Sequence, residues 1–252
     1  MVPRQPAGED GYSGMDRSTF IRRMFEEIAF SYDFQNSFLS LRRDVTWRKI
    51  LARSIQGNGG TLWLDAATGT AEVAIEISRQ RPATRVIGVD FSPGMLAIGR
   101  KKIMGGERDD RIHLAAGDAR RAPFRRASFG GVTMAFGLRN IDERGEVLRE
   151  FRRILKPGGQ LLIMEFGYPD NPVLRMLYRL YFNHVLPPLG NFLSRTDYAY
   201  TYLRDSVRAF PEPEDFLREI GKAGFTHLAI RKLTFGIARI YSGIKAGEEG
   251  IP

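Results

Sequence analysis

Apolar and polar residues follow two alternating patterns between positions 61 and 166. Short apolar runs predict strands at 61–66, 85–90, 111–116, 129–135 and 160–166. Between these runs, apolar residues that recur every three or four positions predict helices near 71–80, 93–104 and 142–155. Strands and helices in this order form a parallel sheet that is covered by helices on both faces.

Helical patterns also precede the first strand. Ser18 or Thr19 can cap a first helix, which breaks near Ser31, and a second helix covers roughly 42–54. A glycine-rich turn at 57–60 then leads into the first strand.

The last part of the chain predicts a helix near 212–223 and strands near 227–234 and 236–244, with Gly236 at the turn between the strands. Upstream, Lys156-Pro-Gly-Gly159 is expected to end the helix near 142–155 and to turn tightly into the next strand. A terminal antiparallel pair on an otherwise parallel sheet is typical of class I methyltransferases that use S-adenosylmethionine (SAM).

The turn after the first strand and the end of the second strand indicate a nucleotide-like ligand. The stretch Thr61-Leu-Trp-Leu-Asp-Ala-Ala-Thr-Gly-Thr70 runs from an apolar strand into a small-residue turn, and Asp90 lies 20 residues beyond Thr70. A carboxylate at about this spacing binds the ribose of a nucleotide. Because the turn has Gly69 but no second or third glycine, it fits a dinucleotide pyrophosphate poorly and favours SAM, which has no phosphate.

In open α/β sheets, ligands bind beyond the carboxyl ends of the strands. Asp65 could bind the methionine ammonium, directly or through water, and Asp90 could accept hydrogen bonds from both ribose hydroxyls. Asp118 lies where the adenine amino group could donate to it. Asp90 by itself could equally be a helix cap, so the prediction depends on the ordered set. That set of cofactor-binding candidates comprises Asp65, Thr68, Gly69, Thr70, Asp90, Phe91, Asp118, Ala119 and Ala135.

These patterns predict an α/β fold, a Rossmann-like class I methyltransferase with a mostly parallel seven-stranded sheet and an antiparallel C-terminal strand. We expect a flexible tail at 1–17, a helical N-terminal cap at 18–60 and the SAM-binding core at 61–169. An aromatic cap insertion follows at 170–210, then the C-terminal helix and strand pair of the core at 211–245 and a tail at 246–252.

Composition excludes several kinds of site. With 252 residues, 43% of them hydrophobic, the chain can bury one substantial core. It has no cysteine and only three histidines, far apart in sequence, so we expect no disulfide and no metal site. The N-terminus lacks a signal core and no apolar run reaches the roughly 18 residues that span a bilayer, so a cytoplasmic protein is expected.

The net charge of +9 is compatible with binding to RNA, with binding to an anionic membrane surface or with a role in solubility alone. The basic clusters, such as Arg100-Lys101-Lys102, are dispersed along the chain and can be read as solvated faces. Three or four basic residues on one face would give weak, reversible attachment to anionic lipid.

Several longer stretches resemble the ubiquinone/menaquinone biosynthesis C-methyltransferase family. They include Phe25-Glu-Glu-Ile-Ala-Phe-Ser-Tyr-Asp33, Phe136-Gly-Leu-Arg-Asn140 and His184-Val-Leu-Pro187. The resemblance covers nearly everything from 20 to 245. Two departures concern the cofactor: Ala71-Glu72 replaces the usual Gly-Asp, which would add a methyl group close to the cofactor, and Ala135 replaces a common serine.

The resemblance implies transfer of the SAM methyl group to a ring carbon of a demethylated isoprenoid quinol, such as demethylmenaquinol or a ubiquinol precursor. By position it also implies Thr70, Asp90, Asp118 and Ala119 as cofactor residues. It is compatible with weak peripheral contact with the inner face of the cytoplasmic membrane and with a homodimer, and we expect no nucleic-acid partner.

A quinol carbon becomes nucleophilic when a ring hydroxyl loses its proton, so the site needs a base and donors for the developing oxyanion. Our candidates are Arg139 for the oxyanion and His184, or a water it orients, for the proton, with Tyr32, Asn140 and Asp197 nearby. Three of them have a structural alternative: Arg139 could bridge the N-terminal helix to the sheet, His184 could only pack, and Tyr32 could only cap a helix.

The aromatic residues at 178–202 could be the core of a lid or an apolar channel for an isoprenoid tail. Two other functions remain open. One is methylation of another small aromatic molecule or of RNA, and the other is a non-catalytic SAM-binding subunit.

Overall fold

In the computed structural model, the described residues are 16–30, 32–33, 37, 40–57, 61–105, 110–185 and 199–247. Their strands are β1 (Leu62–Ala66), β2 (Arg85–Asp90), β3 (Ile112–Ala116), β4 (Phe129–Ala135), β5 (Leu155–Phe166), β6 (Phe225–Leu233) and β7 (Ala238–Lys245). The helices are α1 (Arg17–Ile28), α3 (Arg43–Arg53), α4 (Glu72–Gln80), α5 (Pro93–Gly105), α6 (Arg144–Ile154), α7 (Pro172–Leu180), α9 (Ala199–Ala209) and α10 (Pro213–Lys222).

The strands form one seven-stranded sheet in the order β3-β2-β1-β4-β5-β7-β6. β7 runs antiparallel to both β5 and β6, and the other neighbours are parallel. The predicted fold class is therefore confirmed. The order reverses between β1 and β4, which is where an open α/β sheet binds its ligand.

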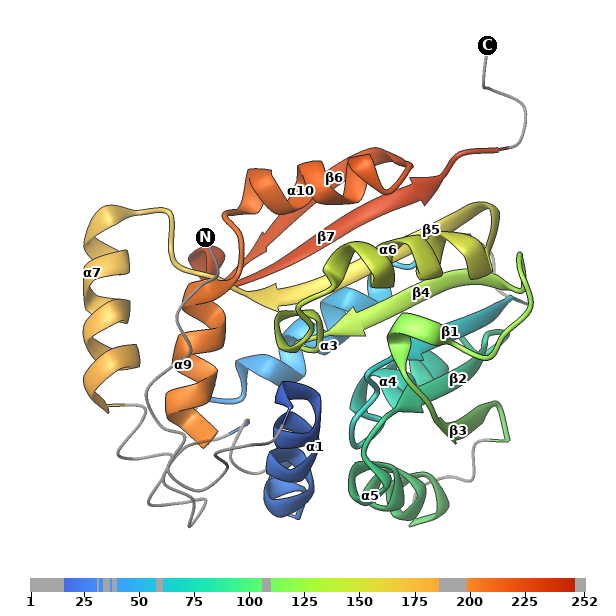
Figure 1. Cartoon of the computed structure of the whole chain (residues 1–252), viewed down its shortest axis with the longest axis horizontal. Helices are drawn as coiled ribbons and strands as arrows, with labels where there is room; N and C mark the ends of the chain where they lie inside the picture. Colours follow the sequence, from blue (N-terminus) through green and yellow to red (C-terminus); the bar gives the residue numbers. More distant parts are fainter. Residues whose placement is uncertain are drawn as a thin grey trace.

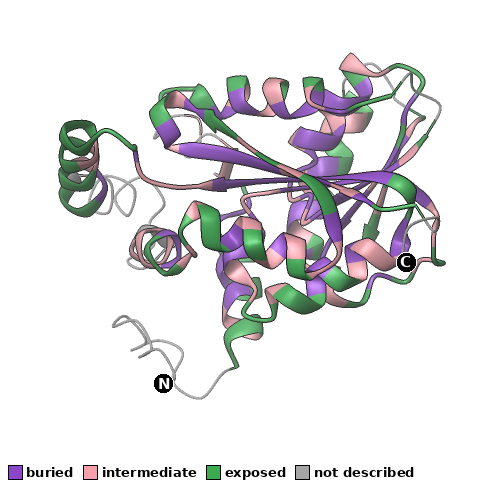
Figure 2. Ribbon diagram, turned by 90° about the horizontal axis from the view of Figure 1, so that it is seen from above, coloured by how far each residue is buried: buried purple, intermediate pink, exposed green. Residues whose placement is uncertain are grey.

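Side chains that alternate along the strands bury both faces of the sheet. On β5, Leu161 and Ile163 join a core with α6 and α10, whereas Leu162 and Met164 join a second core with α3 and α4. Seen nearly edge-on, the sheet has helices on both sides (Figure 2).

The N-terminal and insertion segments lie beyond the carboxyl ends of the strands. α1 packs against α5, and α9 contacts the short 3-10 turn Leu138–Asn140 that follows β4. Figure 1 shows α1 and α9 at this end of the sheet, with α7 standing outside them. Aromatic residues of α7, of the π-helical turn Tyr181–Val185 and of α9 pack with α1.

Two local predictions were wrong. The first helix is capped by Asp16, whose carboxylate accepts from the Thr19 backbone N–H and hydroxyl, and not by Ser18 or Thr19. Lys156–Gly159 does not precede the fifth strand but lies inside it. Leu155 pairs with Phe129, and Gln160 pairs with Gly131. The residues between them, 156–159, therefore form an irregularity in the strand, and Gly158 adopts a φ of +75° there.

Candidate active site

Two adjoining cavities lie at the carboxyl ends of β1, β2 and β4. The larger has a volume of about 520 Å³ and the smaller about 290 Å³. Six residues line both cavities: Phe25, Tyr32, Ala67, Gly69, Ala135 and Phe136. The turn after β1 therefore forms part of a wall that the two cavities share.

The backbone of that turn is unusual. Ala67, Gly69 and Ala71 have φ values of +50°, +55° and +65°, in the left-handed region that favours glycine. A Cβ at Gly69 would meet nothing within 4 Å, so the conformation, not crowding by the protein, calls for glycine there. The open space beside Gly69 leaves the backbone accessible to a ligand.

Asp90 ends β2 and lines the smaller cavity. Its carboxylate accepts hydrogen bonds from the backbone N–H groups of Gly69 (2.8 Å) and Ser92 (2.9 Å). Burial raises the pKa of this carboxyl. Asp90 thus ties the β1 turn to the start of α5, and it also faces the smaller cavity.

Asp118, Ala119 and Phe91 line the same smaller cavity. Burial alone would raise the pKa of Asp118, but hydrogen bonds from Arg120 lower it. One Asp118 oxygen lies 2.7 Å from the Arg120 guanidinium. The two predicted carboxylates, Asp90 and Asp118, are therefore brought to one compartment by different strands.

Asp65, Thr68 and Thr70 line the larger cavity. Asp65 is 1% exposed and accepts from the hydroxyls of Thr68 (2.5 Å) and Thr133 (2.8 Å). Burial raises the pKa of Asp65 to about 6. The Thr70 hydroxyl donates to Asp33 (2.6 Å), which bridges the turn to the N-terminal segment.

The expected crowding by Ala71 is not what the structure shows. Ala71 is fully buried and lines neither cavity. Its methyl group instead faces α5, where a Cβ added to Gly99 would lie 3.1 Å away. The methyl group that alanine has and glycine lacks therefore packs between the β1 turn and α5. Ala135, the second departure, does line both cavities.

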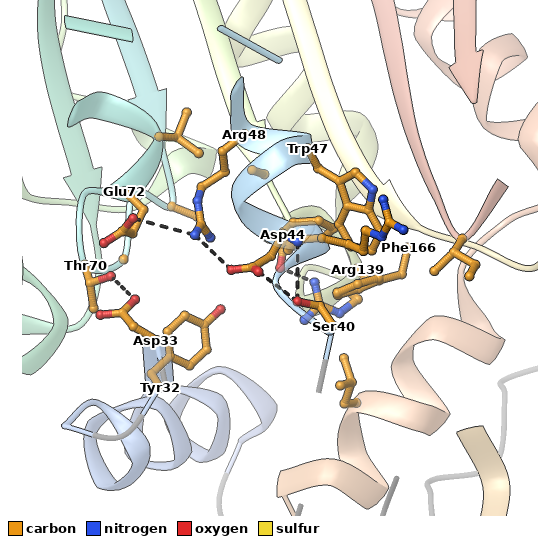
Figure 3. Close-up of a pocket in the computed structure, with 18 of the residues that line it drawn as sticks. Tyr32, Asp33, Ser40, Asp44, Trp47, Arg48, Thr70, Glu72, Arg139 and Phe166 are labelled. Atoms are coloured by element: carbon orange, nitrogen blue, oxygen red, sulfur yellow. Dashed lines mark hydrogen bonds and ion pairs between the residues drawn. The ribbon is translucent and has the colours of Figure 1, made fainter. Parts of the chain in front are cut away.

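Glu72 belongs to a charged network that the sequence did not reveal. Lys102 lies 2.5 Å from Asp33 and 2.6 Å from Glu72, and Arg48 lies 2.8 Å from Asp44 and 3.6 Å from Glu72. Figure 3 shows part of this chain of charges along the wall of the larger cavity. The reading of Lys102 as part of a solvated basic cluster was wrong, because its ammonium is held between two carboxylates.

Arg139 lines the larger cavity and is 9% exposed. Its guanidinium lies 3.3 Å from the buried carboxylate of Glu165 and over the Phe166 ring, 5.4 Å from the ring centre. It also donates to the carbonyl oxygen of Phe136. Its Nε, although buried, finds no hydrogen-bond acceptor among the described residues. A buried N–H without an acceptor is uncommon and calls for a structural or functional explanation.

The other candidate catalytic residues are placed differently. Tyr32 lines both cavities, and Asn140 lines the smaller one, where its side-chain oxygen accepts from the Tyr202 hydroxyl (3.1 Å). His184 is exposed on the π-helical turn and lines neither cavity, so the structure does not bring it to the site. Asp197 lies outside the described residues.

Comparisons with known proteins agree on the family. The model of the ubiE/COQ5 methyltransferase family matches residues 14–245. The chain is 43% identical to the ubiquinone/menaquinone biosynthesis C-methyltransferase UbiE of Geobacter sulfurreducens, over 93% of this chain and 91% of that protein. It is 40% identical to the demethylmenaquinone methyltransferase of Deinococcus radiodurans, over 96% and 98%.

Solved structures resemble the fold at lower identity. A possible histamine N-methyltransferase of Thermotoga maritima matches with a TM-score of 0.63 at 19% identity, over 89% of this chain and 99% of that one. Phosphoethanolamine N-methyltransferase 2 of Haemonchus contortus, in complex with SAM, matches with a TM-score of 0.64 at 17% identity, over 93% and 61%.

Proposed function

Because the chain belongs to the ubiE/COQ5 methyltransferase family, we propose that it methylates a ring carbon of a demethylated isoprenoid quinol, demethylmenaquinol or a ubiquinol precursor. The chain is a SAM-dependent methyltransferase. The observation that carries the quinol proposal is the guanidinium of Arg139 on the wall of the larger cavity, which shares a wall with the cavity that Asp90 and Asp118 line.

The smaller cavity suits the adenosine part of SAM. Asp90 would hold the ribose hydroxyls, and Asp118 with Ala119 would bind the adenine, next to the Phe91 ring. The turn 68–70 would let the ligand pass close to the backbone at Gly69, and Asp65 would hold the methionine ammonium. When bound, SAM supplies a methyl group on a sulfonium carbon, which is already activated for transfer.

The larger cavity suits the acceptor ring. Nearby aromatic side chains, such as Phe136 stacked on Phe166 with ring centres 4.2 Å apart, would enclose the ring and keep water away. A guanidinium beside a ring hydroxyl favours the ionised form of that hydroxyl. Arg139 would therefore stabilise the quinolate, with Tyr32 and Asn140 as further donors, and water could take the proton. His184 has no part in this proposal because it lies outside both cavities.

The acceptor can be tested directly. Purified protein is incubated with SAM and a short-chain demethylmenaquinol kept reduced by dithionite, and the product is analysed by mass spectrometry. We expect a ring-methylated quinol and one equivalent of S-adenosylhomocysteine. Methylation of RNA or of a simple phenol in its place, or cofactor binding without turnover, would contradict the proposal.

We further propose weak peripheral contact with the inner face of the cytoplasmic membrane, because the acceptor carries a long apolar tail and the chain has a net charge of +9. In the described part of the chain, no helix has the length and apolar character required to cross a bilayer. A homodimer also fits this proposal, and light scattering of the purified protein would test it.

A further inference from the structure

Helix α7 carries an apolar stripe that points away from the protein. Val173, Met176, Leu177 and Leu180 recur at helical spacing and are 60%, 57%, 54% and 52% exposed. Figures 1 and 2 show α7 standing at the edge of the molecule, away from the sheet. Clustered, exposed apolar side chains of this size mark an interaction surface.

The other side of α7 fixes this orientation. Tyr178 stacks on Phe182 with ring centres 5.3 Å apart and lies edge-on to Tyr168 at 6.1 Å. Tyr178 also lines the larger cavity. The helix therefore has one face in the wall of the cavity and the opposite face in solvent.

Charge around the stripe is positive. α7 contains Arg175 and Arg179 and no acidic residue, and Arg208 is exposed on the neighbouring α9. Arg179 lies over the Tyr168 ring at 5.4 Å. The acidic residue of α9, Asp205, is paired with Arg204 at 2.8 Å. Both arginines of α7 lie on the side away from the stripe, because Arg175 Nε donates to the Pro169 carbonyl oxygen (2.8 Å) and Arg179 covers the Tyr168 ring. A helix with apolar residues on one face and basic residues on the other suits the surface of an anionic bilayer.

Two more exposed apolar residues lie at the larger cavity, which α7 lines through Tyr178. Leu41 and Phe235 both line that cavity, yet they are 82% and 74% exposed. Exposed apolar side chains at a cavity that also borders α7 provide a path on which a prenyl chain stays out of water. The path is useful only if the acceptor has such a chain.

We infer that α7 docks its apolar stripe into an anionic bilayer, so that a prenylated acceptor can enter the larger cavity from the lipid. The inference rests on the proposed function and adds the element that makes the membrane contact. The four stripe residues line neither cavity. A substitution in the stripe can therefore change membrane binding without changing a residue of the cavities.

The test compares two exposed helical methionines. Met176→Glu places a negative charge in the apolar stripe of α7. Met104→Glu, the control, places the same charge on α5, where Met104 is 70% exposed. Binding is measured by co-sedimentation with vesicles of phosphatidylcholine alone or mixed with phosphatidylglycerol. We expect the unmodified protein to bind the mixed vesicles, and Met176→Glu to bind them at least about tenfold more weakly, with Met104→Glu unchanged.

Turnover is then measured with two acceptors. With a short-chain quinol in solution, both variants should match the unmodified protein, and thermal unfolding should confirm that both fold. With a long-chain quinol embedded in mixed vesicles, Met176→Glu alone should be slower, by about tenfold. Failure of the unmodified protein to methylate the soluble quinol would overturn the proposed function itself.

Other outcomes overturn only the inference. One is equal vesicle binding by Met176→Glu and Met104→Glu. Another is that Met176→Glu converts a dimer into a monomer in light scattering while vesicle binding persists, which would make the stripe a contact between copies. Equal binding to vesicles with and without phosphatidylglycerol would remove the role of the arginines.

Discussion

At the scale of single residues, both cavities are lined by carboxylates, and they differ in the position of Arg139. The smaller compartment brings together Asp90 and Asp118, whereas the larger has Arg139 in its wall. Arg139 and Glu165 form a buried ion pair, and removal of one member of such a pair leaves the other charge uncompensated. A substitution of Arg139 can therefore lower activity by unfolding the protein, and its test needs a variant that removes both charges.

We expect Arg139→Ala to lower kcat for quinol methylation by roughly 10²–10³, the effect of losing a donor to a developing oxyanion. Affinity for S-adenosylhomocysteine should stay within about twofold, because Arg139 does not line the smaller cavity. The double variant Arg139→Met, Glu165→Gln removes both charges, so that no uncompensated charge is left buried in the folded state. A folded double variant with unchanged kcat would exclude the proposed role.

Asp65 should make cofactor affinity depend on pH. Its pKa of about 6 lies above the ordinary 3.8, so between these values the folded state holds a proton that the unfolded chain has released. The free energy of unfolding contributed by Asp65 therefore falls as pH rises through this window. The ionised form binds an ammonium, so affinity for S-adenosylhomocysteine should rise about tenfold from roughly pH 5 to pH 7.

Calorimetric titration across this range tests the prediction. Asp65→Asn should bind more weakly and lose the rise centred near pH 6, while any contribution from Asp90 remains in that variant. The same rise in the variant and in the unmodified protein would show that Asp65 does not contact the ammonium.

At the scale of elements, strand positions followed from the apolar pattern to within about two residues for most strands, because the central strands are buried on both faces and read as apolar runs. The exception, β5, arose because proline and glycine at 157–159 indicate a turn locally. The strand resumes its pairing after them, since Leu155 and Gln160 both find partners on β4. Local rules could not show that pairing.

The contact between α5 and the β1 turn gives a prediction at this scale. A Cβ at Gly99 would lie 3.0 Å from Cδ1 of Leu114 on β3, 3.1 Å from the Ala71 methyl and 3.2 Å from the Thr70 backbone carbon. Gly99→Ala should therefore lower the free energy of unfolding by about 1–3 kcal/mol and weaken S-adenosylhomocysteine binding, because the turn must shift. Chemical denaturation and calorimetry measure the two effects.

Gly105→Ala, at the end of the same helix, is the matched control, since a Cβ there meets nothing within 4 Å. Adding Ala71→Gly to Gly99→Ala removes one of the close contacts and should partly restore the free energy of unfolding and the binding of S-adenosylhomocysteine. If Gly99→Ala behaved like Gly105→Ala, the turn would not depend on this packing.

At the scale of the whole molecule, the cofactor residues come from several strands and the turns after them, so binding should stabilise the entire fold. At a concentration 100 times its Kd, S-adenosylhomocysteine should add about 2.7 kcal/mol and raise Tm by roughly 5–10 °C. NADH should give no comparable shift, because the β1 turn lacks the glycines that admit a pyrophosphate. Differential scanning calorimetry measures both.

In the same experiment, Asp90→Asn should lose most of the shift, because it loses the charged acceptor for the ribose. Its folding without ligand must be checked separately, since Asp90 also holds two backbone N–H groups. Stabilisation by NADH, or a full shift in folded Asp90→Asn, would contradict the proposed binding mode.

The sequence by itself determined the sheet, the edge at which Asp65, Asp90 and Asp118 gather, and the family, because these depend on local periodicity and on short motifs at strand ends. Only the tertiary structure decided which polar residues face a cavity. It left His184 outside, placed Lys102 between two carboxylates and paired Arg139 with Glu165. Those outcomes depend on contacts between residues far apart in the chain, and no local pattern encodes such contacts.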